Sequence, residues 1–498
     1  MASALIFLDV ILVVLGIYVL KQFLERRRLQ LPPGPTGLPF IGNVLDMPRA
    51  NESEVFSQWR KRFGDIIYLN LFGQPMIILN SPELAIQMLE KKSSVYSDRP
   101  KMVFGGEMVG WNQTLVLTPY GDRFREYRRF MHQLIGGRTQ VKRFHSLSEM
   151  ETHKFLKRVL GSPDQVQDHI RQYVLCLHTM MFRRTQLQPS TAGSLILKMA
   201  YGYEVHDGHD SYVDLVELAM DQFSILAQPG AFLVDIIPIL RHVPTWFPGA
   251  GFRKTAQLWR KNLDDMVDIP YEFVKRRLAE QNDEPNFTSY FLEKEELVGD
   301  KESRIKWTAA SLYGGGADTT VSANYSFFLA MTLHPEAQRK AQDELDRVVG
   351  LDRLPTFEDR EQLPYVEALV TEVLRWKPVA QLNIPHRVMQ DDVQDGYLIP
   401  KGSLVVANIS GFLHDPDVYE NPHNFVPERF LPQAGKTLPP DSRDYCFGFG
   451  RRICPGLYFA DASVWITCAM TLAAFDISKA VENGKIIEPT VEYTSGVI

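Results

Sequence analysis

The residues whose types and spacing best suit chemistry lie in residues 445–456, which read Y-C-F-G-F-G-R-R-I-C-P-G. In this stretch Cys454 follows a glycine-rich segment, stands two residues after Arg452 and directly precedes a Pro-Gly pair. Glycine and proline form turns, and a nearby cation favours the thiolate over the thiol. A purely structural cysteine needs neither feature, so we predict that Cys454 is a ligand.

Two of the three kinds of site that such a cysteine can serve fit the spacing poorly. A zinc site would need Cys446, His414 or His423 as partners, but the sequence has no short C-x-x-C or H-x-x-x-H spacing. A dinucleotide-binding loop would need G-x-G-x-x-G, and Ile453 stands where the third glycine belongs.

Thiolate ligation of heme iron is the third possibility, and it uses every feature of the stretch. It requires one cysteine held in a turn whose backbone N–H groups point at the sulfur. Gly450, Pro455 and Gly456 provide that turn. A helix beginning near Leu457 would place its positive N-terminus beside the thiolate, and Arg452 is suited to a heme propionate.

An acid and a hydroxyl interrupt an apolar segment with helical periodicity, residues 307–333. Three consecutive glycines, residues 314–316, lie in its middle, and each costs about 1 kcal/mol relative to alanine. Asp318 and Thr319 follow them. Either the glycines admit a neighbouring element while Thr319 bonds back to a carbonyl, or the helix opens for a ligand and the pair manages protons. We favour the second interpretation.

Glu372 and Arg375 lie one helical turn apart in L-P-Y-V-E-A-L-V-T-E-V-L-R-W. The same spacing occurs at Glu126 and Arg129, so the spacing alone carries little weight. The apolar residues around the first pair indicate burial, and a buried pair needs a further partner. Arg429, in F-V-P-E-R-F, can provide it.

The elements that must position these residues are mostly helical. Two β-rich runs, residues 66–72 and 76–81, flank Gly73-Gln74-Pro75 and predict a β-hairpin. Helical periodicity dominates after the hairpin, and short strand patterns return at residues 397–399 and 404–407. The sequence therefore predicts a mainly α fold with a small β domain.

The N-terminus has the pattern of a membrane anchor. Residues 2–20 are apolar apart from Asp9, and the cations of residues 21–28 follow them, which predicts an N-terminal transmembrane helix with the remainder in the cytosol. The alternative is a helix packed on the body. Residues 1–28 form the expected anchor and its basic flank, residues 29–43 a stiff proline-rich tether, and residues 44–498 a single domain.

Composition narrows the function classes further. The 498 residues carry a formal charge of −6, which argues against nucleic acid as a partner. The four cysteines form no evenly spaced framework, as expected for free thiols in a reducing compartment.

Residues 231–252 are apolar and contain three prolines, so they cannot form one long helix. We weigh two interpretations equally. The segment is either a buried loop or a substrate-access loop that dips into the same membrane as the anchor.

Taken together, these motifs resemble the cytochrome P-450 family. F-G-F-G-R-R-I-C-P-G is similar to the signature F-x-x-G-x-R-x-C-x-G at all five fixed positions, and G-G-G-A-D-T-T, E-V-L-R and P-E-R-F precede it in the family's order. The anchor and tether resemble those of microsomal members. The segments Y-G-D-R-F-R-E-Y-R-R and M-H-Q-L-I-G are most similar to the sequences of fungal members of specialised metabolism.

The resemblance implies a role for each candidate residue. Cys454 becomes the axial ligand of heme b, Phe447 packs beside it, and Gly450 shapes the loop. Asp318 and Thr319 become the acid–alcohol pair that delivers protons, and the glycines at 315 and 316 open the helix. Glu372, Arg375 and Arg429 become the triad that braces the heme loop. Arg128, His386 and Arg452 become the partners of the heme propionates.

The resemblance also implies a function. We expect a monooxygenase that hydroxylates a lipophilic small molecule, a terpenoid or similar secondary metabolite, with O2 and electrons from an NADPH-cytochrome P-450 reductase. The expected location is the endoplasmic reticulum membrane, single-pass, with the catalytic domain in the cytosol. Basic residues, Arg123, Arg129 and Arg451, are expected to dock the reductase. The alternatives are a heme-thiolate isomerase or dehydratase, or a heme-binding protein without turnover.

By position in the family, six residues are expected to line the substrate pocket: Phe104, Met108, Trp111, Tyr313, Leu382 and Ile384. Two departures stand out. Phe124 occupies a position where tryptophan is usual, so an indole N–H donor is lost. The chain ends at Ile498, roughly two dozen residues earlier than the resemblance leads us to expect, which would leave an unpaired strand edge and impair pocket closure.

Overall fold

The computed structural model describes residues 30–166, 170, 193–204, 210–226, 230–282, 285–482 and 484–489. The predicted anchor, residues 1–28, and the predicted C-terminal edge at Ile498 lie outside the described residues.

The predicted fold class is confirmed, because helices form most of the described chain and the strands are few and short. The helices of at least eight residues are α2 (Glu52–Phe63), α4 (Asp122–Ile135), α6 (His145–Gly161), α8 (Gly193–Tyr201), α9 (Ser211–Leu226), α11 (Gly251–Ala279), α12 (Phe287–Lys294), α13 (Lys301–Leu333), α14 (Pro335–Val348), α15 (Pro364–Trp376) and α18 (Leu457–Ala474). Shorter α-helices are α3 (Pro82–Ala85), α5 (Arg138–Val141), α10 (Leu233–Ile236), α16 (Ile409–Leu413) and α17 (Arg443–Cys446). Short 3-10 or π segments include η1 (Ile86–Lys91), η2 (Val103–Val109), η6 (Pro238–His242), η7 (Phe357–Gln362), η8 (Pro427–Phe430) and η9 (Gly450–Arg452).

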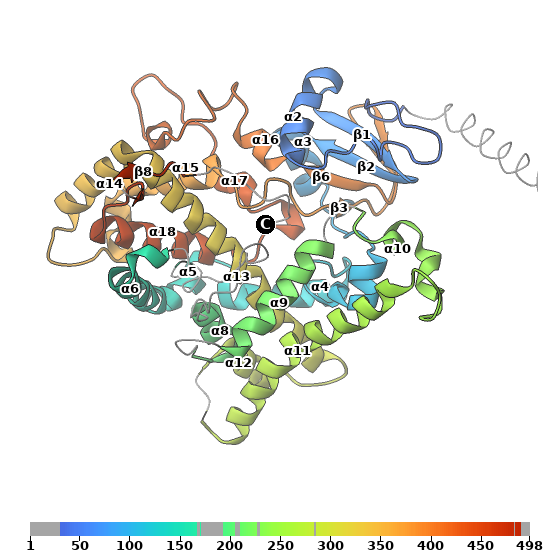
Figure 1. The fold of residues 1–498 in the computed structure, drawn as a ribbon, viewed down its shortest axis with the longest axis horizontal. Helices are drawn as coiled ribbons and strands as arrows, with labels where there is room; N and C mark the ends of the chain where they lie inside the picture. The colour runs from blue at the N-terminus through green and yellow to red at the C-terminus, as the bar shows by residue number, and fades with distance from the viewer. Residues whose placement is uncertain are drawn as a thin grey trace, which may run out of the picture.

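The main sheet sits at one corner of the molecule, at the upper right of Figure 1, beside α2 and α3. Its order is β1 (Ile66–Leu71), β2 (Gln74–Leu79), β6 (Leu404–Ala407) and β3 (His386–Arg387). The first and last pairs are antiparallel and the central pair is parallel. Separate two-stranded ribbons are β4 (Asp392–Gln394) with β5 (Tyr397–Ile399), and β7 (Val481–Glu482) with β8 (Lys485–Ile486).

The predicted hairpin is confirmed, but its turn lies earlier than expected. Gln74 and Pro75 already belong to β2, and Leu71 pairs with Gln74. The turn is therefore Phe72-Gly73, with φ angles of 50° and 86°. Two left-handed residues match the right-handed twist of a tight hairpin, which explains why the turn needs only two residues.

The helix α13 runs through the middle of the molecule and packs against α4, α8, α15 and α18. Its 33 residues extend for about 50 Å. Most of its apolar side chains are buried in the largest hydrophobic cluster, which explains why the segment has few charges.

Among the described residues, α18 is a helix long and apolar enough to cross a membrane. However, 67% of it is buried in the protein, and Trp465, Ile466 and Cys468 are fully enclosed. We therefore interpret α18 as a core helix that begins directly after the cysteine loop.

The predicted tether does not stand free of the body over its described part. The backbone N–H of Tyr68 donates to the Pro33 carbonyl at 2.9 Å, and the N–H of Leu398 donates to the Gln30 carbonyl at 2.9 Å. A Cβ on Gly34 would lie 2.0 Å from the Tyr68 carbonyl oxygen. The segment is thus pinned along β1, at a distance that only glycine permits.

Candidate active site

The cysteine loop joins α17 to α18 through two residues in the left-handed region, Gly448 at φ 75° and Gly450 at φ 54°. The N–H of Cys454 donates to the Phe447 carbonyl at 2.8 Å and closes the loop. A Cβ on Gly450 would lie 2.3 Å from the backbone oxygen of Leu89 in η1. Glycine is therefore required at 450 both for its backbone conformation and for the close approach of η1.

The Cys454 side chain is exposed. Surrounding protein still makes desolvation the largest influence on its thiol, and this raises the pKa, while the Gly456 N–H and the Arg128 guanidinium lower it. Cys446 differs, because burial raises its thiol pKa to about 12 and its Sγ donates to the Leu374 carbonyl at 3.4 Å. Of these two thiols, only Cys454 combines access with groups that favour the thiolate.

The three predicted propionate partners reach the region around the loop from separate elements. Arg128 on α4 donates to the Ile453 carbonyl at 2.6 Å. Arg452 donates to the carbonyls of Ser97 at 2.8 Å and Thr118 at 2.7 Å. His386 on β3 is buried, and burial together with neighbouring arginines holds its pKa well below the usual value.

Arg99 belongs to the same group and was missed by the sequence reasoning. It is buried, and its guanidinium donates to the carbonyls of Val116 at 2.9 Å, Ile384 at 2.7 Å and Pro385 at 2.9 Å. Burial, and then the positive charge of Arg452, lower its pKa well below the usual range. No spacing pattern marks Arg99, since its contacts come from two distant segments.

Arg99, Arg128 and Arg452 form no ion pair with any carboxylate in the part of the chain that the structure describes. Burying positive charge without a counter-ion is costly. The two carboxylates of heme b have the charge that this group lacks. The residues present therefore fit the cofactor: Cys454 would hold it through its thiolate, and the arginine group would bind its propionates.

Phe124, where tryptophan was expected, has a definite role in this region. Its buried ring lies 3.8 Å from the guanidinium carbon of Arg452. The cation–π contact fixes the arginine without an indole donor.

On α13, the carboxyl of Asp318 is buried and its Oδ1 has no hydrogen-bond partner among the described atoms. Burial, and secondarily the charge of Asp221, raise its pKa to about 7. Thr319 donates to the Gly315 carbonyl at 2.9 Å. A buried carboxyl that titrates near neutral pH is suited to giving and taking a proton.

The glycines of α13 face different surroundings. A Cβ on Gly316 would lie 3.0 Å from Ile196 of α8, and one on Gly314 would lie 3.5 Å from Met220 of α9. Gly315 is exposed, and a Cβ there would meet no atom within 4 Å. Two of the glycines therefore permit close packing, and the third leaves open space beside Thr319.

The prediction that these glycines open the helix is wrong in this structure, because α13 is continuous from Lys301 to Leu333. Thr319 back-bonds to a carbonyl, as the alternative interpretation expected.

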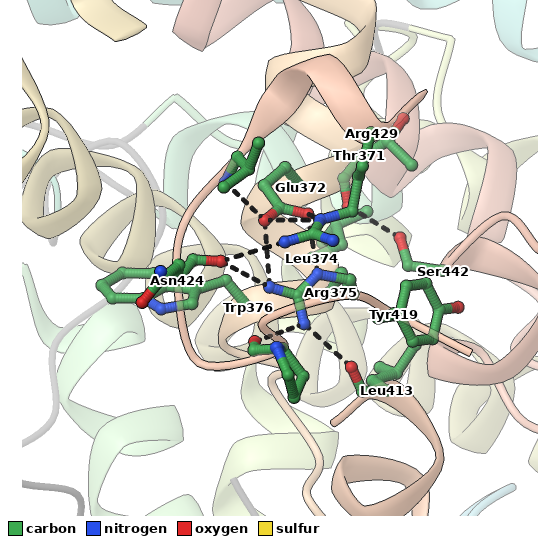
Figure 2. Close-up of polar contacts among 12 residues, drawn as sticks. Thr371, Glu372, Leu374, Arg375, Trp376, Leu413, Tyr419, Asn424, Arg429 and Ser442 are labelled. Carbon is green, nitrogen blue, oxygen red and sulfur yellow. Dashed lines mark hydrogen bonds and ion pairs between the residues drawn. The ribbon is translucent and has the colours of Figure 1, made fainter. Parts of the chain in front are cut away.

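Glu372, Arg375 and Arg429 form the predicted triad, on α15 and η8 (Figure 2). Arg375 contacts Glu372 through two nitrogens, at 2.7 and 2.9 Å, and Arg429 approaches the same carboxylate at 3.1 and 3.2 Å. Both members of the α15 pair have no exposed side-chain surface.

The triad also holds backbone that no sequence pattern indicated. Arg375 donates to the carbonyls of Leu413, Pro422 and Asn424, and Glu372 accepts the N–H of Val426 at 2.7 Å. This buried network therefore fixes the irregular segment between α16 and η8.

The six predicted pocket residues do not all lie together. Phe104, Met108, Trp111 and Tyr313 belong to the large helical core. Leu382 packs instead against the separate cluster formed by β1, β2 and α2, and the Ile384 carbonyl accepts from Arg99. The first four are therefore the better candidates for a common pocket wall.

Within the described residues, three features together match a heme-thiolate protein: a continuous helix bearing a buried acid, an exposed cysteine, and a group of arginines without carboxylate partners. The sequence profile of the cytochrome P450 family matches residues 32–493, and the chain belongs to that family. Its members bind heme b through a cysteine thiolate, and they are oxidoreductases that take electrons from a redox partner.

Three curated fungal proteins illustrate the similarity. Cytochrome P450 monooxygenase 208 of Postia placenta is 52% identical over 98% of this chain and 92% of its own length. Cytochrome P450 monooxygenase claR of Ampulloclitocybe clavipes is 44% identical over 98% of this chain and 88% of its own. Cytochrome P450 monooxygenase ppsD of Aspergillus oryzae is 39% identical over 99% and 92%, respectively.

Proposed function

We propose that this protein is a monooxygenase that hydroxylates a lipophilic secondary metabolite with O2 and with electrons that an NADPH-cytochrome P450 reductase delivers. The observation that carries the proposal is the succession on α13 of a buried carboxyl at Asp318, whose Oδ1 has no partner among the described residues, and of the Thr319 hydroxyl, which bonds to the carbonyl of Gly315 beside open space. An isomerase or dehydratase would not need such a proton supply.

In this proposal heme b, when bound, supplies the oxygen chemistry, and the side chains control protons, orientation and water. Asp318 holds a proton at its carboxyl, whose pKa of about 7 lets both forms exist at neutral pH. The Thr319 hydroxyl, one residue further, could turn its hydrogen away from the Gly315 carbonyl, give that hydrogen to an acceptor on its open side, and take the Asp318 proton in replacement, so that the hydroxyl stays neutral and Asp318 becomes a carboxylate. Cys454 would hold the group through its electron-rich thiolate.

Apolar residues support a lipophilic substrate. Trp111 contacts Phe223 of α9 with ring centroids 4.6 Å apart, and Phe104 stacks on Phe232 at 3.5 Å. A wall of aromatic rings binds hydrocarbon surface well and offers few groups for polar ligands. A terpenoid or polyketide has this character.

The reductase would dock on basic residues near the cysteine loop. Arg451 is exposed, and neither it nor Arg123 forms an ion pair within the described part of the chain. Arg129 is less suitable than predicted, since Glu126 and Glu295 contact it at 3.1 and 3.2 Å. Arg123 and Arg451 therefore carry this part of the proposal.

Membrane attachment at the endoplasmic reticulum also belongs to the proposal. The segment of residues 231–252 is not the buried loop that one interpretation expected, because Leu233 is 65%, Ile239 71% and Trp246 80% exposed. Apolar side chains this exposed support contact with a lipid surface. The segment would lie in the bilayer beside the substrate's route of entry.

Co-expression with a reductase tests the proposal. The reduced carbon monoxide complex should give a thiolate-type Soret band, and Cys454→Ala should abolish it. Thr319→Ala should keep the band but make most NADPH consumption unproductive, since only the proton supply is damaged. Thr332→Ala is a matched control, because Thr332 makes the same bond, to the Phe328 carbonyl at 2.8 Å, elsewhere on α13. Equal coupling in the two threonine variants would refute the proton role.

A further inference from the structure

A second ionic network lies between α15, α17 and α18, separate from the triad. Arg443, at the start of α17, contacts Glu367 of α15 and Asp461 of α18, each at 2.7 Å. Its other terminal nitrogen contacts Asp441 at 2.8 Å and the Thr371 hydroxyl at 3.1 Å. One guanidinium thus joins three helices and the segment that enters α17.

Arg360 of η7 completes this network. It contacts Glu367 at 2.9 Å and Asp461 at 2.8 Å, and its guanidinium carbon lies 5.2 Å from the ring centre of Trp465. Burial alone would lower the pKa of Arg443, but its carboxylate partners outweigh burial and raise it. The arginine remains charged, and a charged group bonded to three carboxylates is held firmly.

The contacts of Arg443 fall on both sides of the cysteine loop. Asp441 and Arg443 precede residues 447–456, and Asp461 lies just after them, near the start of α18. Ser442 adds a bond to the Thr371 carbonyl at 2.8 Å (Figure 2). The N-terminal end of the loop is therefore fastened directly to α15, and the C-terminal end is fastened to it through Arg443 and Arg360, which both contact Glu367.

We propose that Arg443 is a positioning residue for Cys454, and that it acts by clamping the two ends of the cysteine loop onto α15. The triad of Glu372, Arg375 and Arg429 has a different task, because its backbone contacts hold residues 413–426, ahead of the loop. The proposal rests on Cys454 being the heme ligand, the assignment that Cys454→Ala tests separately.

The physical reason is the geometry that ligation requires. Ligation would require the Cys454 sulfur to be held in one position, whereas a ten-residue loop with free ends samples many conformations. Arg443 and Asp461 have 18% and 16% of their side-chain surface exposed, so solvent weakens their attraction less than at an open surface. Release of either end would let the sulfur leave the iron and take up a proton.

The test measures the bound state of the cysteine rather than turnover. Arg443→Gln holoprotein is reduced, saturated with carbon monoxide and held at a temperature where far-UV circular dichroism is unchanged. The thiolate-type Soret band should convert to the thiol-type band about tenfold faster than in the wild-type protein. Arg443→Lys keeps the positive charge but loses the several N–H donors of the guanidinium. Its conversion rate should therefore lie between those of the wild-type and Arg443→Gln proteins.

Arg353→Gln is the matched control, because Arg353 also forms a two-nitrogen contact, at 2.7 Å each, to Asp359 outside the clamp. It should lower the melting temperature without speeding the conversion. If Arg443→Gln only lowers the melting temperature, as Arg353→Gln does, the positioning role is refuted. Should Arg443→Gln yield no holoprotein, Asp461→Asn decides in the same assay, and a wild-type conversion rate there refutes the clamp.

Discussion

At the scale of single residues, the most informative side chain is Asp318. Its neighbours in sequence are small, and its carboxyl lies in the core without a partner for Oδ1 among the described residues. Desolvation then favours the protonated form. The same environment that suits a proton donor also ties the stability of the protein to pH.

The raised pKa of Asp318 predicts a specific pH dependence. Folding raises the pKa from 3.8 to about 7, so the favourable contribution of the protonated carboxyl is complete below pH 3.8 and is lost as the pH rises through 7. Across this window the free energy of unfolding should fall by about 4 kcal/mol at most. Asp318→Asn should remove this part of the slope and make the protein more stable than wild type at pH 8.

Urea unfolding at pH 5 and pH 8 measures the free energy of unfolding of the wild-type and Asp318→Asn proteins.

Asp359 should change the stability with pH in the opposite direction, because the Arg353 guanidinium and other bonds lower its pKa to about 2. The stability from Asp359 is present above pH 3.8 and is lost as the pH falls through 2, so Asp359→Asn should be destabilising at both test values. Equal slopes in wild-type and Asp318→Asn proteins would contradict the shifted pKa.

The sequence marked individual candidate residues where a local pattern was present. Cys454 was singled out by its turn formers, and its role as a ligand stays a prediction. Arg429 was expected from the need of a buried pair for a third partner, and the contact with Glu372 is present. Arg99 and Arg443 were not recognised. Their partners are carbonyls and carboxylates from segments that are distant in the sequence, so no local spacing pattern could indicate these contacts.

At the scale of elements, α15 is the organising helix, since two separate charged groups extend from it. The triad occupies residues 372 and 375, and the clamp occupies residues 367 and 371. Such groups hold irregular backbone that hydrophobic packing alone would not fix, because loops offer few apolar side chains.

Breaking the triad should lower the free energy of unfolding far more than breaking an ion pair of the same sequence spacing at the surface. Arg375→Ala leaves the Glu372 carboxylate buried with only Arg429 and one N–H, and should lower the free energy of unfolding by about 3–5 kcal/mol and reduce heme incorporation. Arg129→Ala removes an i,i+3 contact with Glu126 and a second contact with Glu295, but the arginine is 45% exposed, so the change should cost about 1 kcal/mol or less. Chemical denaturation of both variants makes the comparison, and similar losses would refute the role of burial.

Element types were predictable to different degrees. Strands β5 and β6 lie where the sequence placed them, and α13 was expected from its periodicity. The parallel pairing of β2 with β6 was not foreseen, because strand patterns specify a buried face but not the partner. The continuity of α13 through its glycines was also missed, since packing against α8 and α9 offsets their low helix propensity.

At the scale of the whole molecule, the described part of the tether is a component of the body. Gly42, at φ 64°, lies so close to β1 that a Cβ would approach the Asn70 carbonyl oxygen to 2.0 Å. The side chain of Asn43 also donates to the Pro35 carbonyl at 2.9 Å. The predicted tether therefore contacts the body from residue 30 onward.

Two truncations test the effect of these contacts. Removal of residues 2–28 should leave the thiolate-type Soret band and the melting temperature near wild type while releasing the protein from membranes. Removal of residues 2–43 should expose the edge of β1 and lower the melting temperature by several degrees or cause aggregation. Equal melting temperatures would show that the tether adds nothing to the fold.

The parallel pairing of β2 with β6 has a consequence for biosynthesis. The Gln74 side chain donates to the Gly402 carbonyl across 328 positions, and Arg452 reaches Ser97 across 355. At about 5–20 residues per second, a ribosome needs about 20 s to 1 min to make the intervening chain. During that time the hairpin has no neighbour along β2. The corner that seats the cysteine loop is therefore among the last parts to assemble, and the nascent chain must be protected from aggregation until then.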